Sequence, residues 1–251
     1  MIDILKAAQK AEGSLIRNYA DSSELPDTAT TTERIAYLED TRTLRFNNGV
    51  WDDPLLGAPA AAASGTQAQG SISGYSSGGN GSTPGYQNTI EKYSFVSDAN
   101  STDVGDLTRT SLSPTGQSSD VSGYTSGGLT PAISNIIDKF PFAVDANATD
   151  VGNLTQARRG GSGQISETDG YTSGGFAPPQ YNIIDKFPFA VDTNATDVGD
   201  LTIAMWTSAG QSSTTDGYNS GGIVPPSTIR NQIEKFSFSV DGNSSDVGDL
   251  T

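Results

Sequence analysis

The chain of 251 residues contains no cysteine and no histidine. Without cysteine it forms no disulfides and offers no thiol nucleophile, and without either residue it has no Cys/His zinc site. The absence of histidine also removes the general base of a Ser-His-Asp triad. The common routes to nucleophilic and zinc-dependent catalysis are therefore excluded.

Positive charge is also scarce, since 14 Lys and Arg residues face 29 Asp and Glu residues and give a net charge of −15. Lys and Arg drive binding to phosphates, so we expect no nucleic-acid partner. The chain opens with MIDILKAAQK and has no 18-residue apolar stretch. We therefore expect neither a signal peptide nor membrane insertion. The acidic balance is typical of a soluble protein that resists non-specific association.

The first 19 residues show helical spacing, because their apolar residues recur at three- and four-residue steps. These residues are Ile4, Leu5, Ala8, Ala11 and Leu15. The pattern predicts a helix within residues 2–19, with Asp3 as its cap. A single amphipathic helix cannot bury its apolar stripe alone, so it must pack on a neighbour or on another chain.

Residues 34–52 alternate apolar and polar side chains, and Asn48-Gly49 is a strong hairpin signal. We predict a three-stranded meander here, which needs a packing partner because isolated hairpins are marginal. Residues 1–55 then form an anchoring module of helix and meander, followed by a linker at residues 56–63. The residues predicted to dock this module are Ile4, Leu5, Ala8, Leu15, Tyr37, Phe46 and Trp51.

The rest of the chain, residues 64–251, repeats one pattern four times. Its Gly-Tyr pairs begin at residues 74, 123, 170 and 217, so the spacings are 49, 47 and 47. A period near 50 residues indicates a repeat architecture. We place the repeats at about 64–108, 109–155, 156–202 and 203–251.

Each repeat contains four predicted strands, illustrated by residues 208–216, the Gly-Tyr-Thr-Ser stretch, residues 182–191 and residues 197–206. This length and strand count are typical of a propeller blade, so the predicted fold class is all-β. Pro141 and Pro188 lack a ladder donor, so we expect a bulge or irregular pairing at these prolines. The whole number of repeats favours closure within one chain, and the alternative is an open arc completed by other subunits.

The repeats resemble the kelch family of β-propellers. Double glycines at 78–79, 127–128, 174–175 and 221–222 precede strings of an acidic residue, a lysine and an aromatic residue, such as Asp185-Lys186-Phe187. The resemblance implies a kelch-like β-propeller of four blades of about 47 residues. The chain departs from the family pattern because it lacks the Trp that usually follows this strand. The residues that stand in its place are Leu107, Leu154, Leu201 and Leu250.

Residues 22–51, SSELPDTATTTERIAYLEDTRTLRFNNGVW, resemble a segment of bacteriophage tail-fibre and other virion proteins, although Glu33-Arg34 stands where Gly is common. The repeats are also similar to kelch-like repeats of phage structural proteins. These resemblances imply a virion protein that docks through its N-terminus on other virion proteins of tail or capsid, as a homo-oligomer. The propeller is then displayed to recognise a glycan or protein of the host surface. The alternatives are a capsid decoration or head-fibre protein and a soluble glycan- or protein-binding module.

A motif with the pattern Asp-x-Asn-x-(Thr/Ser)-Asp occurs once in each repeat. Oxygen ligands at alternate positions are how a loop wraps Ca²⁺, although no Glu follows at EF-hand spacing. The alternative, which we favour, is a strand connection whose Asp and Asn side chains bond their own backbone. The residues of these Ca²⁺-like loops are Asp98, Asn100, Asp103, Asp145, Asn147, Asp150, Asp192, Asn194, Asp197, Asp241, Asn243 and Asp246. No other cofactor is expected.

The repeated tyrosines Tyr75, Tyr124, Tyr171 and Tyr218 admit two interpretations, a ring of sugar-stacking platforms or packing between blades, and we favour packing. Arg158-Arg159 is interpreted as a solvated turn rather than an anion site. No single carboxylate departs from the repeat pattern as the acid of a glycoside hydrolase would. We therefore predict no catalytic residue and no enzymatic activity.

Overall fold

The computed structural model describes residues 16–19, 35–38, 43–47, 51–52, 72–81 and 85–251. The chain divides into two compact parts, an N-terminal region of residues 1–64 and a repeat region of residues 65–251. All regular structure in the described residues is β-strand, which confirms the predicted all-β class. The described residues contain no helix that is long and apolar enough to cross a membrane.

The N-terminal region contains one sheet with strand order β1-β2-β3-β4. Its strands are β1 (Ile16–Tyr19), β2 (Ile35–Leu38), β3 (Thr43–Asn47) and β4 (Trp51–Asp52). The antiparallel strands β2, β3 and β4 are the predicted meander. Strand β1 pairs in parallel with β2, so the helix predicted over residues 2–19 is wrong at residues 16–19. The β-branched Ile16 and aromatic Tyr19 are typical strand residues.

The predicted docking residues fall partly within this sheet. Tyr37 lies in β2, Phe46 in β3 and Trp51 in β4. Ile4, Leu5, Ala8 and Leu15 lie outside the described residues.

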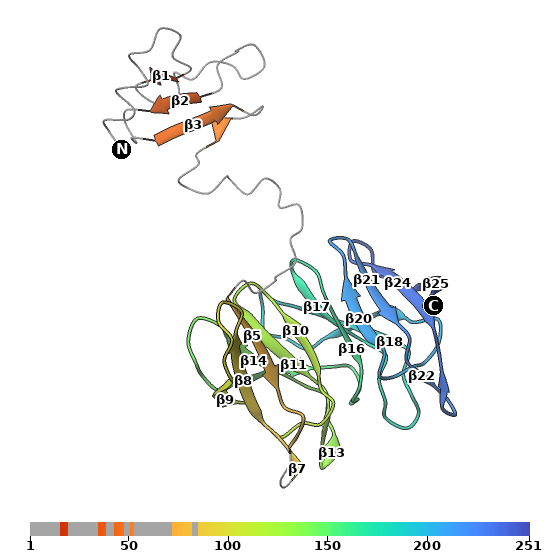
Figure 1. The fold of residues 1–251 in the computed structure, drawn as a ribbon. Coiled ribbons are helices and arrows are strands. Elements are labelled where there is room, and N and C mark those ends of the chain that lie inside the picture. Colours follow the sequence, from red (N-terminus) through yellow and green to blue (C-terminus); the bar gives the residue numbers. More distant parts are fainter. Residues whose placement is uncertain (1–15, 20–34, 39–42, 48–50, 53–71, 82–84) are drawn as a thin grey trace. The chain divides into compact units, whose positions relative to one another are not determined.

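The repeat region consists of four successive antiparallel sheets, which we call units one to four (Figure 1). Unit one contains β5 (Ser73–Ser77), β8 (Thr89–Ser94) and β9 (Thr102–Asp106). Unit two contains β10 (Thr115–Ser118), β11 (Ser122–Ser126), β14 (Ile136–Pro141) and β15 (Thr149–Asn153).

Units three and four repeat the four-stranded pattern of unit two. Unit three contains β16 (Ser162–Ile165), β17 (Asp169–Ser173), β18 (Ile183–Pro188) and β19 (Thr196–Asp200). Unit four contains β20 (Ala209–Ser212), β21 (Asp216–Ser220), β24 (Gln232–Ser237) and β25 (Ser245–Asp249). Each predicted fourth strand is shorter than expected, since β19 ends at Asp200 and not at residue 206.

The double glycines directly follow the strands β5, β11, β17 and β21. Gly127 and Gly128 have φ angles of +66° and +104°, which favour glycine and turn the chain out of the sheet. Short hairpins that the sequence pattern did not predict follow in three units. They are β6 (Asn80–Gly81) with β7 (Gly85–Tyr86), β12 (Leu129–Thr130) with β13 (Ala132–Ile133), and β22 (Ile223–Val224) with β23 (Thr228–Ile229).

The irregular pairing expected at the prolines lies elsewhere. Pro141 is the last residue of β14 and pairs in register with Ser122, so its missing donor interrupts no ladder. The register shift falls instead between Ile137 and Asp138. The same shift occurs between Ile90 and Glu91 in unit one, where no proline is present. The bulge therefore belongs to the repeat and not to proline.

Hydrophobic clusters lie between successive units rather than inside single sheets. Tyr124 of unit two packs against Phe187 and Phe189 of unit three, with ring centroids 5.5 and 5.0 Å apart. Tyr75 and Tyr171 make the same contacts with the units that follow them. The favoured interpretation of these three tyrosines, packing between repeats, is confirmed.

The two ends of the array are open. Leu107, Leu154 and Leu201 are buried, whereas Leu250 at the matching position of unit four is 46% exposed. In unit one, Tyr93 and Phe95 are 41% and 54% exposed. Units one and four lie at opposite sides of the repeat region in Figure 1. Closure of the four repeats within one chain, which we expected, is therefore not seen in the described residues.

Candidate functional site

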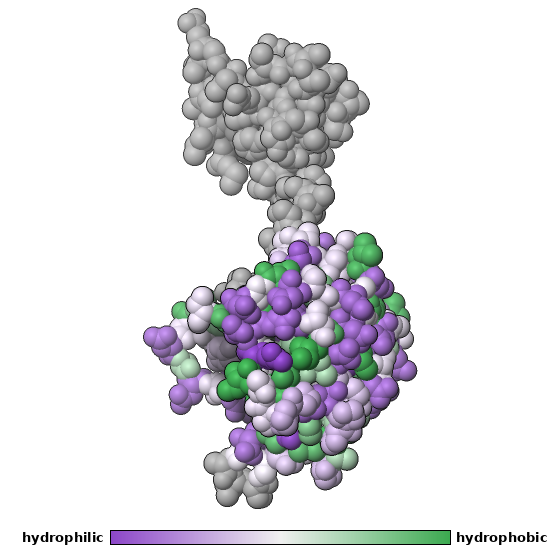
Figure 2. Space-filling model, turned by 90° about the vertical axis from the view of Figure 1, so that its right-hand side faces the viewer, coloured by the Kyte–Doolittle hydropathy of each residue, from purple (hydrophilic) through white to green (hydrophobic). Residues whose placement is uncertain are grey.

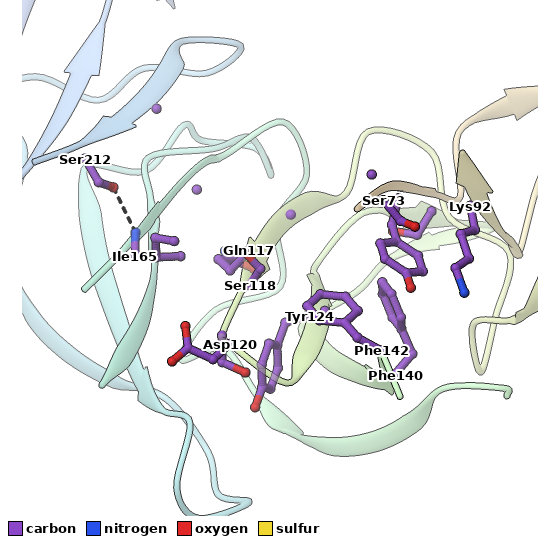
Figure 3. Close-up of a pocket in the computed structure, with 18 of the residues that line it drawn as sticks. Ser73, Lys92, Gln117, Ser118, Asp120, Tyr124, Phe140, Phe142, Ile165 and Ser212 are labelled. Carbon is purple, nitrogen blue, oxygen red and sulfur yellow. Dashed lines mark hydrogen bonds between the residues drawn. The ribbon is translucent and has the colours of Figure 1, made fainter. Parts of the chain in front are cut away.

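The repeat region contains an open cavity of about 820 Å³. The first strands β10, β16 and β20 contribute Gly116, Gly163 and Gly210 to its wall, and unit one contributes residues of β5 and β8. Figure 3 shows Gln117, Ser118 and Asp120 near Tyr124, with Ser73, Lys92, Phe140 and Phe142 farther along the same cavity. The cavity therefore spans several units, so no single repeat could have predicted it.

Glycine brings the first strands close together. A Cβ added at Gly163 would lie 2.2 Å from the carbonyl oxygen of Gly116, and one added at Gly210 would lie 2.2 Å from the carbonyl oxygen of Gly163. A side chain at either position would push the neighbouring strands apart. Small residues on these strands thus narrow the space between units and leave backbone at the cavity wall.

The glutamines of the first strands hold adjacent units together. Gln117 Nε2 donates to the Tyr171 carbonyl oxygen at 2.9 Å, and Gln164 Nε2 donates to the Tyr218 carbonyl oxygen at 3.0 Å. Gln211, the matching residue of unit four, is exposed, and its side-chain nitrogen donates to no described residue. Among the glutamines of the first strands that the structure describes, Gln211 alone can offer its amide nitrogen to a ligand.

The cavity combines aromatic and polar side chains with little charge. Tyr75 stacks on Phe142 at 4.8 Å, and Lys92 Nζ lies 5.9 Å from the centre of the Tyr75 ring. Among the described lining residues, Asp120 is the single acid and Lys92 the single base. This lining lacks the pair of carboxylates that glycoside hydrolysis uses, and it is suited to binding a polar ligand with apolar faces.

The loops that resemble Ca²⁺ sites join successive units. Asp145 Oδ1 forms an ion pair with Lys92 Nζ of the preceding unit at 3.1 Å. Asn147 Oδ1 accepts a hydrogen bond from the backbone nitrogen of Asp106, also in the preceding unit, at 3.0 Å. Asp150 Oδ1 accepts from the backbone nitrogen of Gly152 at 3.1 Å. Each of the three side chains of this loop thus accepts a contact from within the protein through one of its oxygens.

The same arrangement holds in the next loops, where Asp192 and Asp241 accept from lysines, Asn194 and Asn243 from backbone nitrogens, and Asp197 and Asp246 from glycines. In unit one, Asp103 accepts from Gly105, whereas Asp98 and Asn100 are exposed. Among the described residues, no group of three or more Asp or Glu side chains is placed to hold a metal ion. Cation binding at these loops stays a prediction, and the contacts give the motif a role in joining units.

The buried charges are a feature that the sequence pattern missed. Arg158 is 1% exposed and pairs with Asp185 at 2.7 Å, so its interpretation as part of a solvated turn is wrong. Arg109 pairs at 2.9 Å with Asp138, which matches Asp185 one unit earlier, although Arg109 itself lies at a different position of the repeat from Arg158. Burial lowers the pKa of both arginines. Burial also raises the pKa of Asp138, although the hydrogen bond from Thr108 and the charge of Arg109 act to lower it.

Arg159, the neighbour of Arg158, lies over two aromatic rings. Its guanidinium carbon is 5.4 Å from the centre of the Phe176 ring and 5.8 Å from the Trp206 ring. This is a cation–π arrangement between an insert of unit three and the start of unit four. Arg158, which is buried and paired with Asp185, is therefore not available as an anion site.

No family model and no curated protein matches the chain. Among solved structures, that of YjhT is similar, with a TM-score of 0.62 and 12% sequence identity. The match covers 75% of this chain and 66% of that chain. At this identity the likeness concerns the fold alone.

Proposed function

We propose that this chain is a non-enzymatic display and binding protein. In the proposal, the repeat region is an array of four kelch-like propeller blades, carried by the N-terminal region, which attaches it to a larger particle. The observation that carries the proposal is that the repeated charged and aromatic side chains form the contacts between neighbouring units. Lys139, Asp192 and Tyr124, for example, all join neighbouring units.

Support for propeller blades comes from the arrangement of the sheets. Each complete unit is a four-stranded antiparallel sheet, and successive units pack face to face through aromatic clusters. The first strands β10, β16 and β20 lie next to one another, as the inner strands of blades do.

The particle we propose is a bacteriophage virion, with the protein as an appendage of tail-fibre or adhesin type. The support is the resemblance of residues 22–51 and of the repeats to phage structural proteins. Electron cryomicroscopy of the intact particle tests this assignment by tracing the chain into density. Attachment to the tail supports the adhesin, attachment to the capsid indicates a decoration or head-fibre protein, and a particle without this chain contradicts the virion assignment.

The ligand we propose for the cavity is a host-surface glycan. Aromatic residues of the lining supply apolar surface for sugar rings, and Gln211 supplies an amide nitrogen for a hydroxyl. Hydroxyl and backbone groups on β10 add further hydrogen-bonding capacity. This lining favours a neutral polar ligand over a strongly charged one.

Binding of the labelled full-length chain to host cells and to isolated surface polysaccharide tests the ligand. Ser118→Trp places a large side chain at the cavity wall, and we expect it to weaken binding at least about tenfold. The matched control is Thr214→Trp, which changes an exposed residue that does not line the cavity. Equal binding by both variants would contradict the cavity as the glycan site.

A further inference from the structure

The three interfaces between successive units repeat one set of contacts. Each unit presents an outgoing face, which contacts the next unit, and an incoming face, which contacts the previous one. The outgoing face carries a tyrosine, a lysine and a threonine, such as Tyr124, Lys139 and Thr155. The incoming face carries two aromatic residues and an acidic loop, and the two faces are different but complementary.

The ion pair recurs at all three interfaces. Lys92, Lys139 and Lys186 of the outgoing faces pair with Asp145, Asp192 and Asp241 of the incoming faces at 3.1, 2.8 and 2.6 Å. The charge relation between the two faces therefore has a fixed direction, with the lysine always on the outgoing face.

Backbone hydrogen bonds also recur. Asp200 donates its backbone nitrogen to Asn243 Oδ1 at 3.0 Å, and the backbone nitrogen of Ser244 donates to the Asp200 carbonyl oxygen at 2.8 Å. Both bonds recur at the two earlier interfaces. Asp106 bonds in the same way to Asn147 and Ala148, and Asn153 bonds to Asn194 and Ala195. The last strand of one unit is thus bonded to the loop of the next.

A threonine after each last strand donates to a buried acid of the next unit. Thr108 donates to Asp138 at 2.6 Å, and Thr155 donates to Asp185 at 2.7 Å. Thr202 donates to Glu234 at 2.6 Å. Since the acid is Asp in two units and Glu in the fourth, the position tolerates either carboxylate.

Unit four has the outgoing set without a partner among the described residues. Its members are Tyr218, Lys235, Asp249, Leu250 and Thr251, which match Tyr171, Lys186, Asp200, Leu201 and Thr202. Leu250 is 46% exposed, whereas Leu201 is buried. The surface on the side that carries unit four mixes hydrophilic and hydrophobic residues (Figure 2).

Unit one has the incoming set without a partner among the described residues. Its members are Glu91, Tyr93, Phe95, Asp98 and Asn100, which match Glu234, Phe236, Phe238, Asp241 and Asn243. Glu91 already accepts from Ser101 at 2.8 Å, as Glu234 accepts from Ser244, but it lacks the threonine donor that Glu234 has. The missing groups are those that the outgoing face of unit four offers.

We propose that the outgoing face of unit four binds the incoming face of unit one in a second copy of this chain. In this contact Tyr218 packs on Tyr93 and Phe95. Three polar contacts accompany it, namely Lys235 with Asp98, the Asp249 backbone nitrogen with Asn100, and Thr251 with Glu91.

Two copies joined in this way satisfy both open faces of each chain. A contact between two different faces closes into a ring when the rotation allows it. Two copies bring eight units, which lies within the range of four to eight blades found in propellers. The proposal rests on the inter-unit contacts and not on the phage assignment or on the glycan.

Glycine geometry gives independent support. Gly105, Gly152 and Gly199 have φ angles of +158°, +155° and +153°, and a Cβ at each would lie within 2.4 Å of a backbone oxygen of the next unit. Gly248 has the same φ of +153°, but no described atom lies within 4 Å of its Cβ position. Unit four therefore keeps the backbone conformation of a unit that has a following neighbour.

The solution mass of the full chain is the deciding measurement. At about 0.15 M salt, where the Debye length of about 8 Å limits repulsion between chains of net charge −15, we expect twice the chain mass of 26.0 kDa by light scattering. A monomer at tens of micromolar, or a mass above two chains, would overturn the two-copy ring. A chain that closes on itself, with unit four packed on its own unit one, would also show the single-chain mass. That mass therefore overturns the two-copy ring, and a mass of two chains excludes the self-closed monomer.

Phe95→Asp tests whether this particular face makes the contact. Phe95 is largely exposed in the single chain, so the variant should fold normally while its dissociation constant rises at least about tenfold. The matched control is Val121→Asp, which changes an apolar residue of similar exposure in unit two. An unchanged dimer with Phe95→Asp would overturn the proposal.

Single cysteine variants locate the contact, because the chain has no cysteine of its own. Asp249→Cys and Ser101→Cys are prepared separately, mixed and oxidised. A disulfide between them requires two chains, so a cross-linked dimer supports contact between copies. The control is one chain with both Asp200→Cys and Ser244→Cys, which places the same residue types at the interface between units three and four. If this control forms its disulfide under the same oxidation and the mixed variants form none, the result contradicts the proposal.

Discussion

Arg158 Nη2 lies 2.7 Å from Asp185 Oδ2, with both side chains withdrawn from solvent. The same carboxylate accepts hydrogen bonds from the Thr155 backbone nitrogen at 2.9 Å and from its hydroxyl at 2.7 Å. Burial lowers the pKa of Arg158, although an arginine stays charged over the accessible pH range. A buried charge of this kind is stabilised by its partner, so removal of either partner leaves the other uncompensated.

We therefore expect Arg158→Met to lower the free energy of unfolding by about 3–5 kcal/mol. Chemical denaturation at neutral pH measures this loss. Arg230→Met is the control, because Arg230 is exposed and its substitution should change stability by no more than about 0.5 kcal/mol. A loss below about 1 kcal/mol for Arg158→Met would contradict a structural role for the pair.

The misinterpretation of Arg158 shows where sequence reasoning ends. Its neighbours Arg159, Gly160 and Gly161 are typical of a solvated turn. The partner, Asp185, lies 27 residues away on the third strand of the same repeat, and only the fold brings the two together. Arg109 also pairs with a buried acid, but it lies two residues after Leu107 whereas Arg158 lies four residues after Leu154, so the repeat period gave no signal for either arginine.

The strands were predictable because glycine and the repeat period fix their ends. The double glycines terminate β5, β11, β17 and β21 as the spacing predicts, since their positive φ angles exclude most other residues. Strand β1 was not predictable, because Ile16–Tyr19 continues a helical apolar pattern and becomes a strand by pairing with β2. The cavity was not predictable either, since its residues come from separate repeats.

Alkaline pH should destabilise the repeat region through its buried tyrosines. Burial raises the pKa of Tyr171 to about 12, and it also raises the pKa of Tyr124. The fold thus favours the protonated phenol, and its stabilising effect is complete below about pH 10 and is lost as pH rises towards 12. We expect the denaturation midpoint to fall over this range.

The control for the tyrosine effect is Tyr124→Phe/Tyr171→Phe, which removes both ionisations. Its stability should decline less steeply than that of the unchanged protein above about pH 10. Parallel curves for the two proteins would mean that other groups cause the alkaline transition.

The exposed ion pairs should contribute little. Lys139 Nζ donates to Asp192 Oδ1 at 2.8 Å, and this hydrogen bond raises the pKa of Lys139. The lysine therefore adds stability that is present below about pH 10.4 and is lost as pH rises through its raised pKa. Because both side chains reach solvent, we expect Asp192→Asn to cost about 0.2–1 kcal/mol at low salt and less at about 1 M salt. A cost that does not change with salt would argue against an ionic contribution.

The glycines of the last strands separate the effect of backbone conformation from the effect of packing. Gly199 and Gly248 share a φ of +153°, so alanine strains the backbone equally at both positions. A Cβ at Gly199 would also lie 2.2 Å from the Gly242 carbonyl oxygen, whereas a Cβ at Gly248 meets no described atom within 4 Å. We expect Gly199→Ala to be about 1–3 kcal/mol more destabilising than Gly248→Ala in the dissociated chain.

When the dissociation constant of the dimer is measured, Gly248→Ala should have the larger effect of the two variants. If a second copy covers unit four as unit four covers unit three, alanine at residue 248 would meet the backbone of residues 99–100 in the partner copy. Gly248→Ala should then raise the dissociation constant at least about tenfold while the dissociated chain loses no more stability than backbone strain requires. Light scattering over a dilution series, combined with denaturation below the dissociation constant, separates the two effects. A Gly248→Ala protein that dimerises as tightly as the unchanged chain would show that this face stays free in solution.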